Sequence, residues 1–276
     1  MLLIGLTGSI ATGKSTVSSI LSKPPYSLPI IDADLLARKV VEPGTAGYKA
    51  IVKYFGPSTP DLLVPAGQGM PESGTTGKGR PLNRPALGRR VFGEDEQRVK
   101  DRKVLNSIVH PAVRREMFFA VLRSYLLGHR AVVLDVPLLF EGGLDMFCGT
   151  VLVVAVRDPE VQMERLMKRD QFLTREDAEN RVRSQGDVRE KARRCESRGG
   201  KGLGVVVWND GGRDELEKEI GRVVKVIEEH SPRWWNWILW AFPPAAVAVA
   251  GWNYWRNVGI NKRWKVEEEG RERSKL

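Results

Sequence analysis

The chain has 276 residues, with 44 Lys and Arg against 34 Asp and Glu, a formal net charge of +10 and a hydrophobic content of 42%. This length suggests one or two domains, at about 150 residues each, and enough chain to bury a sizeable core. The apolar content, with Cys148 and Cys195 as the two cysteines, excludes a chain disordered throughout, a collagen-like repeat and a disulfide-stapled miniprotein. A reducing compartment is the simplest interpretation.

The N-terminal run 2–6 is apolar and of strand length. It has no basic region before it and no small-residue cleavage site after it, so it indicates a buried strand and not a signal peptide. The residues that follow, Gly8-Ser9-Ile10-Ala11-Thr12-Gly13-Lys14-Ser15, fit the pattern G-x-x-x-x-G-K-[ST] in full. A helix is expected over 16–21, so the pattern stands between a strand and a helix, as a phosphate-binding loop requires.

Each position of this loop suits a nucleoside triphosphate. Gly8 and Gly13 let backbone N–H groups point at phosphate oxygens without an obstructing side chain. Lys14 supplies positive charge to the β- and γ-phosphates, the Ser15 hydroxyl is a Mg²⁺ ligand, and the helix N-terminus adds its dipole. The residues expected to contact ATP are Gly8, Ser9, Ile10, Ala11, Thr12, Gly13, Lys14, Ser15 and Thr16.

Two carboxylates follow the second expected strand, over 29–31, in the segment Asp32-Ala33-Asp34. Ligands of open α/β sheets bind at the carboxyl ends of strands. Alternation puts Asp32 and Asp34 on the same side, where one can accept a proton from an attacking hydroxyl or orient it, and the other can act through Mg²⁺ and its waters. The alternative is that one of them caps the helix expected over 35–41.

The segment 56–81 holds six Gly and five Pro with almost no apolar periodicity, and it is expected to be a flexible surface insertion. Beyond it, apolar runs of strand length recur between charged segments of helical spacing. The expected strands lie over 131–136, 151–156 and 205–208, and the expected helices over 177–193 and 214–229. This alternation predicts an α/β fold with a parallel sheet covered by helices on both faces.

Seven of the eight Trp follow Arg233, and no charged residue occurs from Trp234 to Trp255. As a helix this segment would be roughly 33 Å long, against a hydrocarbon core of about 30 Å. Aromatic residues cluster at both of its ends, as at two membrane interfaces, while Pro243 and Pro244 favour a kink or a re-entrant turn. We predict a transmembrane segment over 233–256; the alternative is a C-terminal helix docked on the protein's own core.

Several segments together resemble the dephospho-coenzyme A kinase family. They are 8–16, 32–38 with Val40-Val41-Glu42-Pro43-Gly44, Leu82-Asn83-Arg84, Ile108-Val109-His110-Pro111, 134–141 and 165–185, ending near Asn209-Asp210-Gly211. A phosphate loop alone occurs in many unrelated proteins. Its combination with the Asp-Ala-Asp segment and the turn Asp135-Val136-Pro137-Leu138-Leu139-Phe140-Glu141 is specific. The resemblance spans 1–228 and leaves the tail unexplained.

The resemblance implies a P-loop nucleoside triphosphate hydrolase-type fold over 1–232, with a helical substrate-binding region and a lid over 157–190. It implies transfer of the γ-phosphate of ATP to the ribose 3′-hydroxyl of dephospho-CoA, which gives CoA and ADP. Asp34 matches the family's proposed general base, with Asp32 beside it, and Lys14 completes the catalytic set. Because the transition state is loose, positioning and charge neutralisation should supply most of the catalysis.

The resemblance also implies binding roles, which are listed here by ligand. Arg169 of the lid and Asn209 are expected at ATP, Asp135 at Mg²⁺ through water, and Asp34, Arg38, His110, Pro137, Leu138 and Phe140 at dephospho-CoA. The alternatives are a solvated charge for the arginine, a structural side chain for the histidine and ordinary core for the apolar turn. No metal site is predicted beyond nucleotide-bound Mg²⁺. Ala11 departs from the family, in which glycine is frequent at that position.

Two other functions stay open at this point. One is a P-loop kinase acting on a nucleoside monophosphate, and the other is a non-enzymatic, membrane-anchored nucleotide switch. Nucleic acid is not an expected partner, because the positive charge is spread over lid-like helices and the tail without the motif of a known nucleic-acid module. With the charged tail over 257–276 behind the membrane segment, we expect a cytoplasmic catalytic domain tethered to an intracellular membrane, either the mitochondrial outer membrane or the endoplasmic reticulum.

Overall fold

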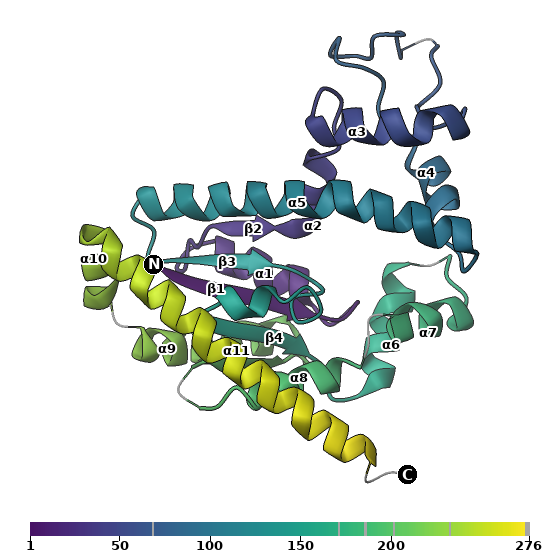
Figure 1. The fold of residues 1–276 in the computed structure, drawn as a ribbon. Helices are drawn as coiled ribbons and strands as arrows, with labels where there is room; N and C mark the ends of the chain where they lie inside the picture. Colours follow the sequence, from purple (N-terminus) through teal and green to yellow (C-terminus); the bar gives the residue numbers. More distant parts are fainter. Residues whose placement is uncertain (68, 171, 185–186, 201, 232, 274–276) are drawn as a thin grey trace. The chain divides into compact units, whose positions relative to one another are not determined.

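The computed structural model describes residues 1–67, 69–170, 172–184, 187–200, 202–231 and 233–273. The chain forms two compact units (Figure 1). The first comprises Met1–Ile31 with Arg123–Leu276, and the second Asp32–Leu122. Each unit is described by itself.

A five-stranded sheet forms the centre of the first unit. Its strands are β1 (Leu2–Gly8), β2 (Ile30–Asp32), β3 (Ala131–Asp135), β4 (Thr150–Ala155) and β5 (Gly204–Trp208). They lie in the order β2-β3-β1-β4-β5, and β1 pairs in parallel with β3 and β4, as β4 does with β5. The apolar runs of the sequence therefore correspond to strands, and the expected parallel α/β sheet is confirmed.

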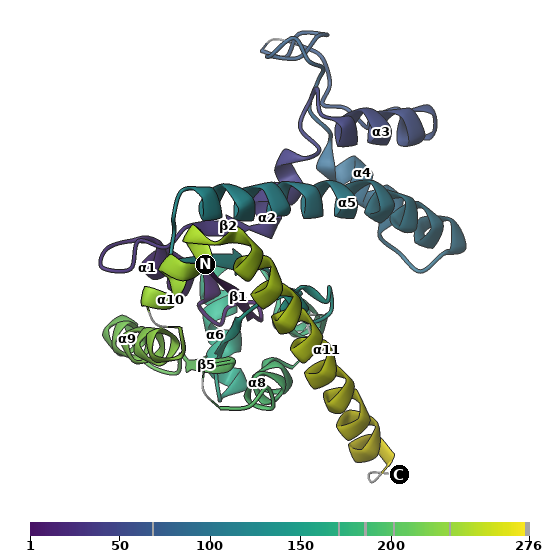
Figure 2. The same cartoon turned by 60° about the vertical axis from the view of Figure 1, so that its left-hand side comes forward.

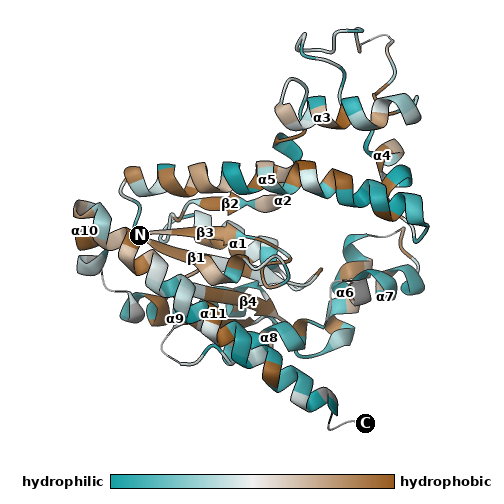
Figure 3. Ribbon diagram, viewed as in Figure 1, coloured by the Kyte–Doolittle hydropathy of each residue, from teal (hydrophilic) through white to brown (hydrophobic). Residues whose placement is uncertain are grey.

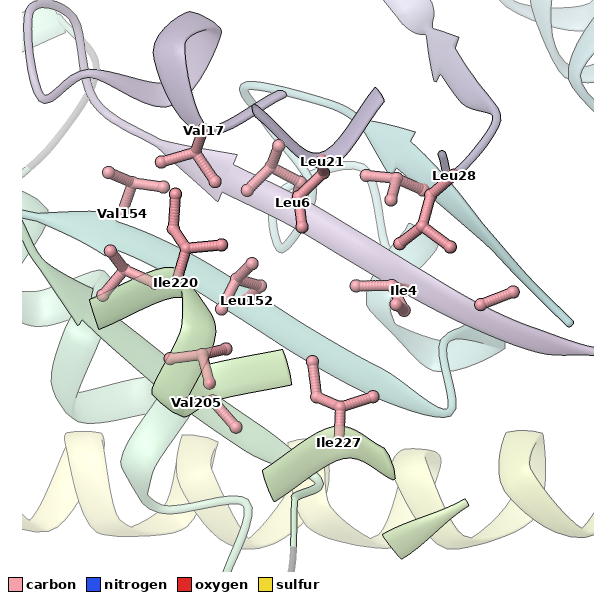
Figure 4. Close-up of a cluster of buried hydrophobic side chains, with 14 of the residues drawn as sticks. Ile4, Leu6, Val17, Leu21, Leu28, Leu152, Val154, Val205, Ile220 and Ile227 are labelled. Carbon is pink, nitrogen blue, oxygen red and sulfur yellow. The ribbon is translucent and has the colours of Figure 1, made fainter. Parts of the chain in front are cut away.

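One face of this sheet is covered by α1 (Lys14–Ser22) and α9 (Arg213–His230). Every second strand residue points into this interface, so Leu6 and Leu152 meet Val17 of α1 and Ile220 of α9 (Figure 4). All four side chains are almost fully buried. The strands β1, β3 and β4 are accordingly hydrophobic along most of their length (Figure 3).

The opposite face carries α8 (Val188–Glu196) and the short 3-10 helix η2 (Leu144–Phe147). The chain that covers this face lies very close to β1, since a Cβ at Gly5 would be 2.7 Å from Cys148 Sγ and from Leu139 Cδ2. Two further helices, α6 (Pro159–Arg169) and α7 (Arg175–Ser184), correspond to the expected lid. The helix expected over 177–193 is thus two helices, and residues 185–186 between them lie outside the described part.

The second unit contains the helices α2 (Ala33–Lys39), α3 (Ala46–Phe55), η1 (Gly56–Ser58), α4 (Arg84–Val91) and α5 (Glu96–Leu126). A small core of Ile51, Phe55, Leu62 and Val91 holds it together. Leu62 belongs to the segment 56–81, whose two ends are joined where Val64 N–H donates to Pro81 O at 2.9 Å. The segment does form a loop, but its base is anchored in the core.

The C-terminal segment forms two helices, α10 (Arg233–Ala241) and α11 (Pro243–Arg273), and not one. Pro243 and Pro244 open α11, a position where proline is tolerated because the first N–H groups of a helix have no partner within it. Among the described residues, no helix combines the length and the apolarity that a membrane crossing needs. The transmembrane segment predicted over 233–256 is therefore not supported by the helices of the described part.

The second half of α11 docks on the sheet unit instead. Figures 1 and 2 show the helix crossing the unit on the side away from α9. Asn257 Nδ2 donates to Cys148 O at 2.8 Å and to Met146 O at 3.1 Å, and Ile260 and Trp264 are buried. Asn261 Nδ2 donates to Asp145 Oδ2 at 2.9 Å. The alternative of a docked helix thus holds for this half, while the expected location at a membrane stays a prediction.

Candidate active site

The phosphate loop leaves the end of β1 and enters α1. At Gly8 a Cβ would lie 2.7 Å from Val154 O, and Gly13 has a φ of 93°, which L side chains rarely adopt. Thr12 Oγ1 donates to Ser9 O at 2.9 Å, which tightens the turn. The two glycines therefore stand where the sequence motif requires them.

Two features of the loop point to a ligand or to strain. Ser9 Oγ is buried and has no hydrogen-bond partner within the described structure, as expected of a group that awaits an external partner. Ala11, at the position where the family often has glycine, has a φ of 60°. This conformation costs a non-glycine residue about 1 kcal/mol or more.

Lys14, the first residue of α1, forms an ion pair with Asp135, the last residue of β3. The register pairs Asp135 with Leu6, so this carboxylate lies near the end of β1, where the phosphate loop begins. The side chains are 17% and 6% exposed. An ammonium group and a carboxylate at the mouth of a phosphate loop are suited to bind phosphate oxygens and a hydrated divalent cation, respectively.

Asn209, expected at ATP, lies at the end of β5 and braces the phosphate loop. Its Nδ2 donates to Thr12 O at 2.8 Å, and its backbone N–H donates to Ala155 O at 2.8 Å. A Cβ at Gly13 would lie 2.3 Å from Asn209 Nδ2. The Asn209 side chain therefore holds the Thr12 carbonyl in place, next to Gly13, where there is no room for a Cβ.

Helix α6, in the segment expected to form the lid, is anchored to the same loop. Gln162 Nε2 donates to Ile10 O at 2.7 Å, and Arg165 donates to Asn209 O at 2.6 Å and to Gly211 O at 3.0 Å. Met163 and Leu166 pack with Ile10 and Ala11 beneath these bonds. Gln162 was missed by the sequence interpretation, because a single glutamine on a charged helix carries no signal of a partner 152 residues away.

Arg169, the lid arginine expected at ATP, is held by its neighbour. Its guanidinium donates to both carboxylate oxygens of Asp170 at 3.0 Å, and Arg181 donates to the same carboxylate at 3.3 Å. The hydrogen bond from Arg169 lowers the pKa of Asp170 and in turn raises the pKa of Arg169. More than half of the Arg169 side chain stays exposed, so it remains accessible to a ligand.

Of the expected substrate residues in the turn after β3, one is exposed and the others have contacts within the protein. Leu138 is 50% exposed and available to a ligand, whereas Phe140 is buried beneath the guanidinium of Arg194 at 4.6 Å. Pro137 O accepts hydrogen bonds from Thr7 Oγ1 at 2.8 Å and from Lys191 Nζ at 3.3 Å. Phe140 and the Pro137 carbonyl thus have structural contacts, and Leu138 presents its side chain.

The remaining expected residues belong to the second unit. Asp32 is the N-cap of α2: its Oδ1 accepts from Asp34 N–H at 2.8 Å and from Leu35 N–H at 3.0 Å. The Asp34 side chain stands in the first turn of α2 and is exposed, as are Arg38 on α2 and His110 on α5. Of the two carboxylates, Asp32 therefore has the capping role, and Asp34 has its carboxylate available.

Comparison with known proteins gives one family throughout. The family model described as dephospho-CoA kinase matches residues 2–198. The dephospho-CoA kinase CAB5 of Saccharomyces cerevisiae is 43% identical over 250 residues, 91% of each chain, and a dephospho-CoA kinase of Bacillus cereus is 42% identical over 222 residues, 80% of this chain and 95% of the relative.

Two solved structures have the same fold. The crystal structure of TT1252 from Thermus thermophilus has a TM-score of 0.60 at 30% identity and covers 81% of this chain and 96% of its own. The fold is also that of a dephospho-CoA kinase from Campylobacter jejuni, with a TM-score of 0.56 at 24% identity over 82% of this chain and 97% of that one. Over residues 2–198, and in relatives that cover most of its length, the match is consistent: this chain belongs to the dephospho-CoA kinase family.

Proposed function

We propose that this chain performs the family's reaction through the phosphate loop, Asp34 and the lid, and so transfers the γ-phosphate of ATP to the ribose 3′-hydroxyl of dephospho-CoA. The observation that carries the proposal is the ion pair of Lys14 and Asp135 at the mouth of a complete phosphate loop, in a chain that belongs to this family. The family match favours this acceptor over the nucleoside monophosphate that the loop and the lid alone would also allow.

On the ATP side, the chain supplies positions and charges. Backbone N–H groups of the loop and the Lys14 ammonium neutralise the charge that spreads over the phosphate oxygens. Asn209 and Gln162 hold the loop carbonyls at Thr12 and Ile10, so the loop is ordered before ATP arrives. Arg169 extends the positive charge from the lid, and closure of the lid would exclude the water that competes with the acceptor hydroxyl.

On the acceptor side, Asp34 accepts the proton of the attacking hydroxyl. A carboxylate within hydrogen-bond reach of a weak nucleophile contributes both orientation and base catalysis. Asp32 supports this role indirectly, because its cap fixes the start of α2, the helix whose first turn carries Asp34. Leu138 and Arg38 are the exposed residues through which the rest of dephospho-CoA would be held.

The donor set suits a Mg²⁺ ion that enters with the nucleotide. Ser15 supplies a hydroxyl at the start of α1, and Asp135 supplies a carboxylate that can hold the ion through water. No cluster of three or more His, Cys, Asp or Glu suited to a metal occurs within the described ranges. When bound, Mg²⁺ would neutralise the β- and γ-phosphate charge.

A coupled ATP assay on the full chain tests the proposal. ADP release is followed with dephospho-CoA, UMP and dTMP as acceptors in parallel, and CoA is identified as the product. We expect turnover with dephospho-CoA alone, and a loss of about 100-fold or more in Lys14→Ala, the size seen when one charge-stabilising group is removed. Phosphorylation of UMP or dTMP without phosphorylation of dephospho-CoA would refute the proposed acceptor.

A further inference from the structure

The uncharged segment 234–255 is far more exposed than its composition leads one to expect. The structure describes this segment throughout, and Leu239 is its one buried side chain. The large exposed aromatic residues on it are Trp234 at 62%, Trp237 at 70%, Trp240 at 46%, Phe242 at 59%, Trp252 at 59%, Tyr254 at 42% and Trp255 at 68%. We name these residues the aromatic face. Apolar surface of this extent, gathered on two consecutive helices, marks an interaction site.

The exposed side chains follow helical spacing. In α10, positions 234, 237, 238 and 241 lie on one face of the helix, and Leu239 lies on the other. Trp237 and Trp240 form an edge-to-face pair with ring centroids 6.1 Å apart, and Trp252 and Trp255 lie 5.3 Å apart on α11. The inner face of α10 is fixed by Tyr125, whose hydroxyl donates to Leu239 O at 2.7 Å. Trp234, Trp237, Trp252 and Trp255 are therefore the most exposed Trp residues above this base. Trp240 lies beside Gly128, and Tyr254 lies against Phe147 of η2 with ring centroids 5.3 Å apart.

The charged residues within the segment that carries the aromatic face have one sign. From 230 to 266 the sequence contains no Asp or Glu, while Arg256, Lys262, Arg263 and Lys265 occur within it. On the outer face of α11, the apolar positions 247, 251 and 255 are followed at helical spacing by Lys262 and Lys265, which are both exposed. The aromatic face thus ends in a basic border.

We propose that the aromatic face docks on the surface of a lipid bilayer that contains anionic lipids, without crossing it. Trp and Tyr favour the boundary between headgroups and acyl chains, because their rings are apolar and their N–H and O–H groups stay hydrated. The Lys side chains of the basic border then meet anionic headgroups. A lipid surface suits a face with cations at its border and no acidic residue on it better than a second copy of the chain does, since two copies would bring like charges together. The proposal is independent of the kinase reaction.

Sedimentation of the full chain with vesicles tests it. Phosphatidylcholine vesicles with and without phosphatidylserine serve as probes, at low and at physiological salt. We expect binding to the vesicles that contain phosphatidylserine and quenching of tryptophan fluorescence by lipids brominated near the headgroup end of the acyl chain. No sedimentation with either kind of vesicle, or a dimer that is lost when the Trp residues are replaced, would overturn the proposal.

Matched variants separate the aromatic and the basic contributions. Trp237→Ser combined with Trp255→Ser should weaken vesicle binding by about tenfold or more, since two large apolar side chains stay in water. Val266→Ser is the control, because Val266 is 70% exposed on the same helix but lies outside the aromatic face. Lys262→Gln combined with Lys265→Gln should remove the preference for phosphatidylserine. Each variant must retain kinase turnover with dephospho-CoA, and equal vesicle binding by the Trp and Val266 variants would contradict the proposal.

Discussion

The side-chain amide of Asn209 donates to the carbonyl of Thr12 at 2.8 Å, which joins the end of β5 to the tip of the phosphate loop. Both atoms are buried, so the bond cannot be replaced by water without movement. Asn209 was expected to contact ATP, and in the structure it binds the phosphate loop.

We expect Asn209→Ala to raise the KM for ATP and to lower the free energy of unfolding by about 1–3 kcal/mol, since the Thr12 carbonyl loses its partner in a buried site. Asn209→Asp should be worse, because two acceptor oxygens then face each other. Steady-state kinetics with each substrate varied and urea denaturation measure the two effects. An unchanged KM for ATP in both variants would exclude the bracing role.

The strands and the phosphate loop could be predicted because their signals are local. A buried parallel strand is a short apolar run, and the loop needs glycines and Lys14 at fixed spacing. The bonds of Asn209 and Gln162 could not be predicted, since their partners lie 197 and 152 residues away in sequence. The transmembrane prediction depended on segment 234–255, which is apolar and carries no charge. Hydropathy alone does not distinguish a membrane-spanning helix from a helix that exposes its aromatic residues.

Asp32 and Asp34 should respond differently to the same change. In Asp32→Asn the amide oxygen can still accept the two N–H bonds at the start of α2, so turnover should stay near that of the wild type. In Asp34→Asn the side chain can no longer accept a proton, and kcat should fall by about 10²–10⁴-fold with little change in stability. The measurement is kcat for both variants with circular dichroism melts as the folding control. A larger loss of turnover in Asp32→Asn than in Asp34→Asn would reverse the assignment.

Arg165 should act as a structural tie between the lid helix and the loop after β5. Its two bonds to Asn209 O and Gly211 O are lost in Arg165→Ala, which should raise the KM for ATP and speed proteolysis of the lid. Arg175→Ala is the matched control: Arg175 is a lid arginine that is 60% exposed and pairs with Glu160, so its loss should change stability by less than about 1 kcal/mol. Similar proteolysis rates for the two variants would show that the tie is dispensable.

Cys148 and Cys195 should be unreactive in the folded protein. Burial raises the pKa of each thiol from 9.0 to about 12, so at pH 8 the reactive thiolate is about a thousandfold scarcer than for an ordinary cysteine. We expect iodoacetamide to label neither thiol in the native state and both in urea, with mass spectrometry as the readout. Complete labelling of the native protein within minutes at pH 8 would contradict the burial of both residues.

The docking of α11 should contribute to the stability of the sheet unit. Asn257 donates to the Cys148 and Met146 carbonyls, and beside it Arg198 and Asp145 form an ion pair at 2.8 Å that is 1% and 0% exposed. Asn257→Ala leaves these carbonyls without that donor and should lower the free energy of unfolding by about 1–3 kcal/mol. Val266→Ser, on the exposed side of the same helix, should change it by less than about 0.5 kcal/mol. Both are measured by urea denaturation. If the two variants were equally stable, the second half of α11 would not be held to the sheet unit by Asn257, and its docking would rest on Asn261, Ile260 and Trp264.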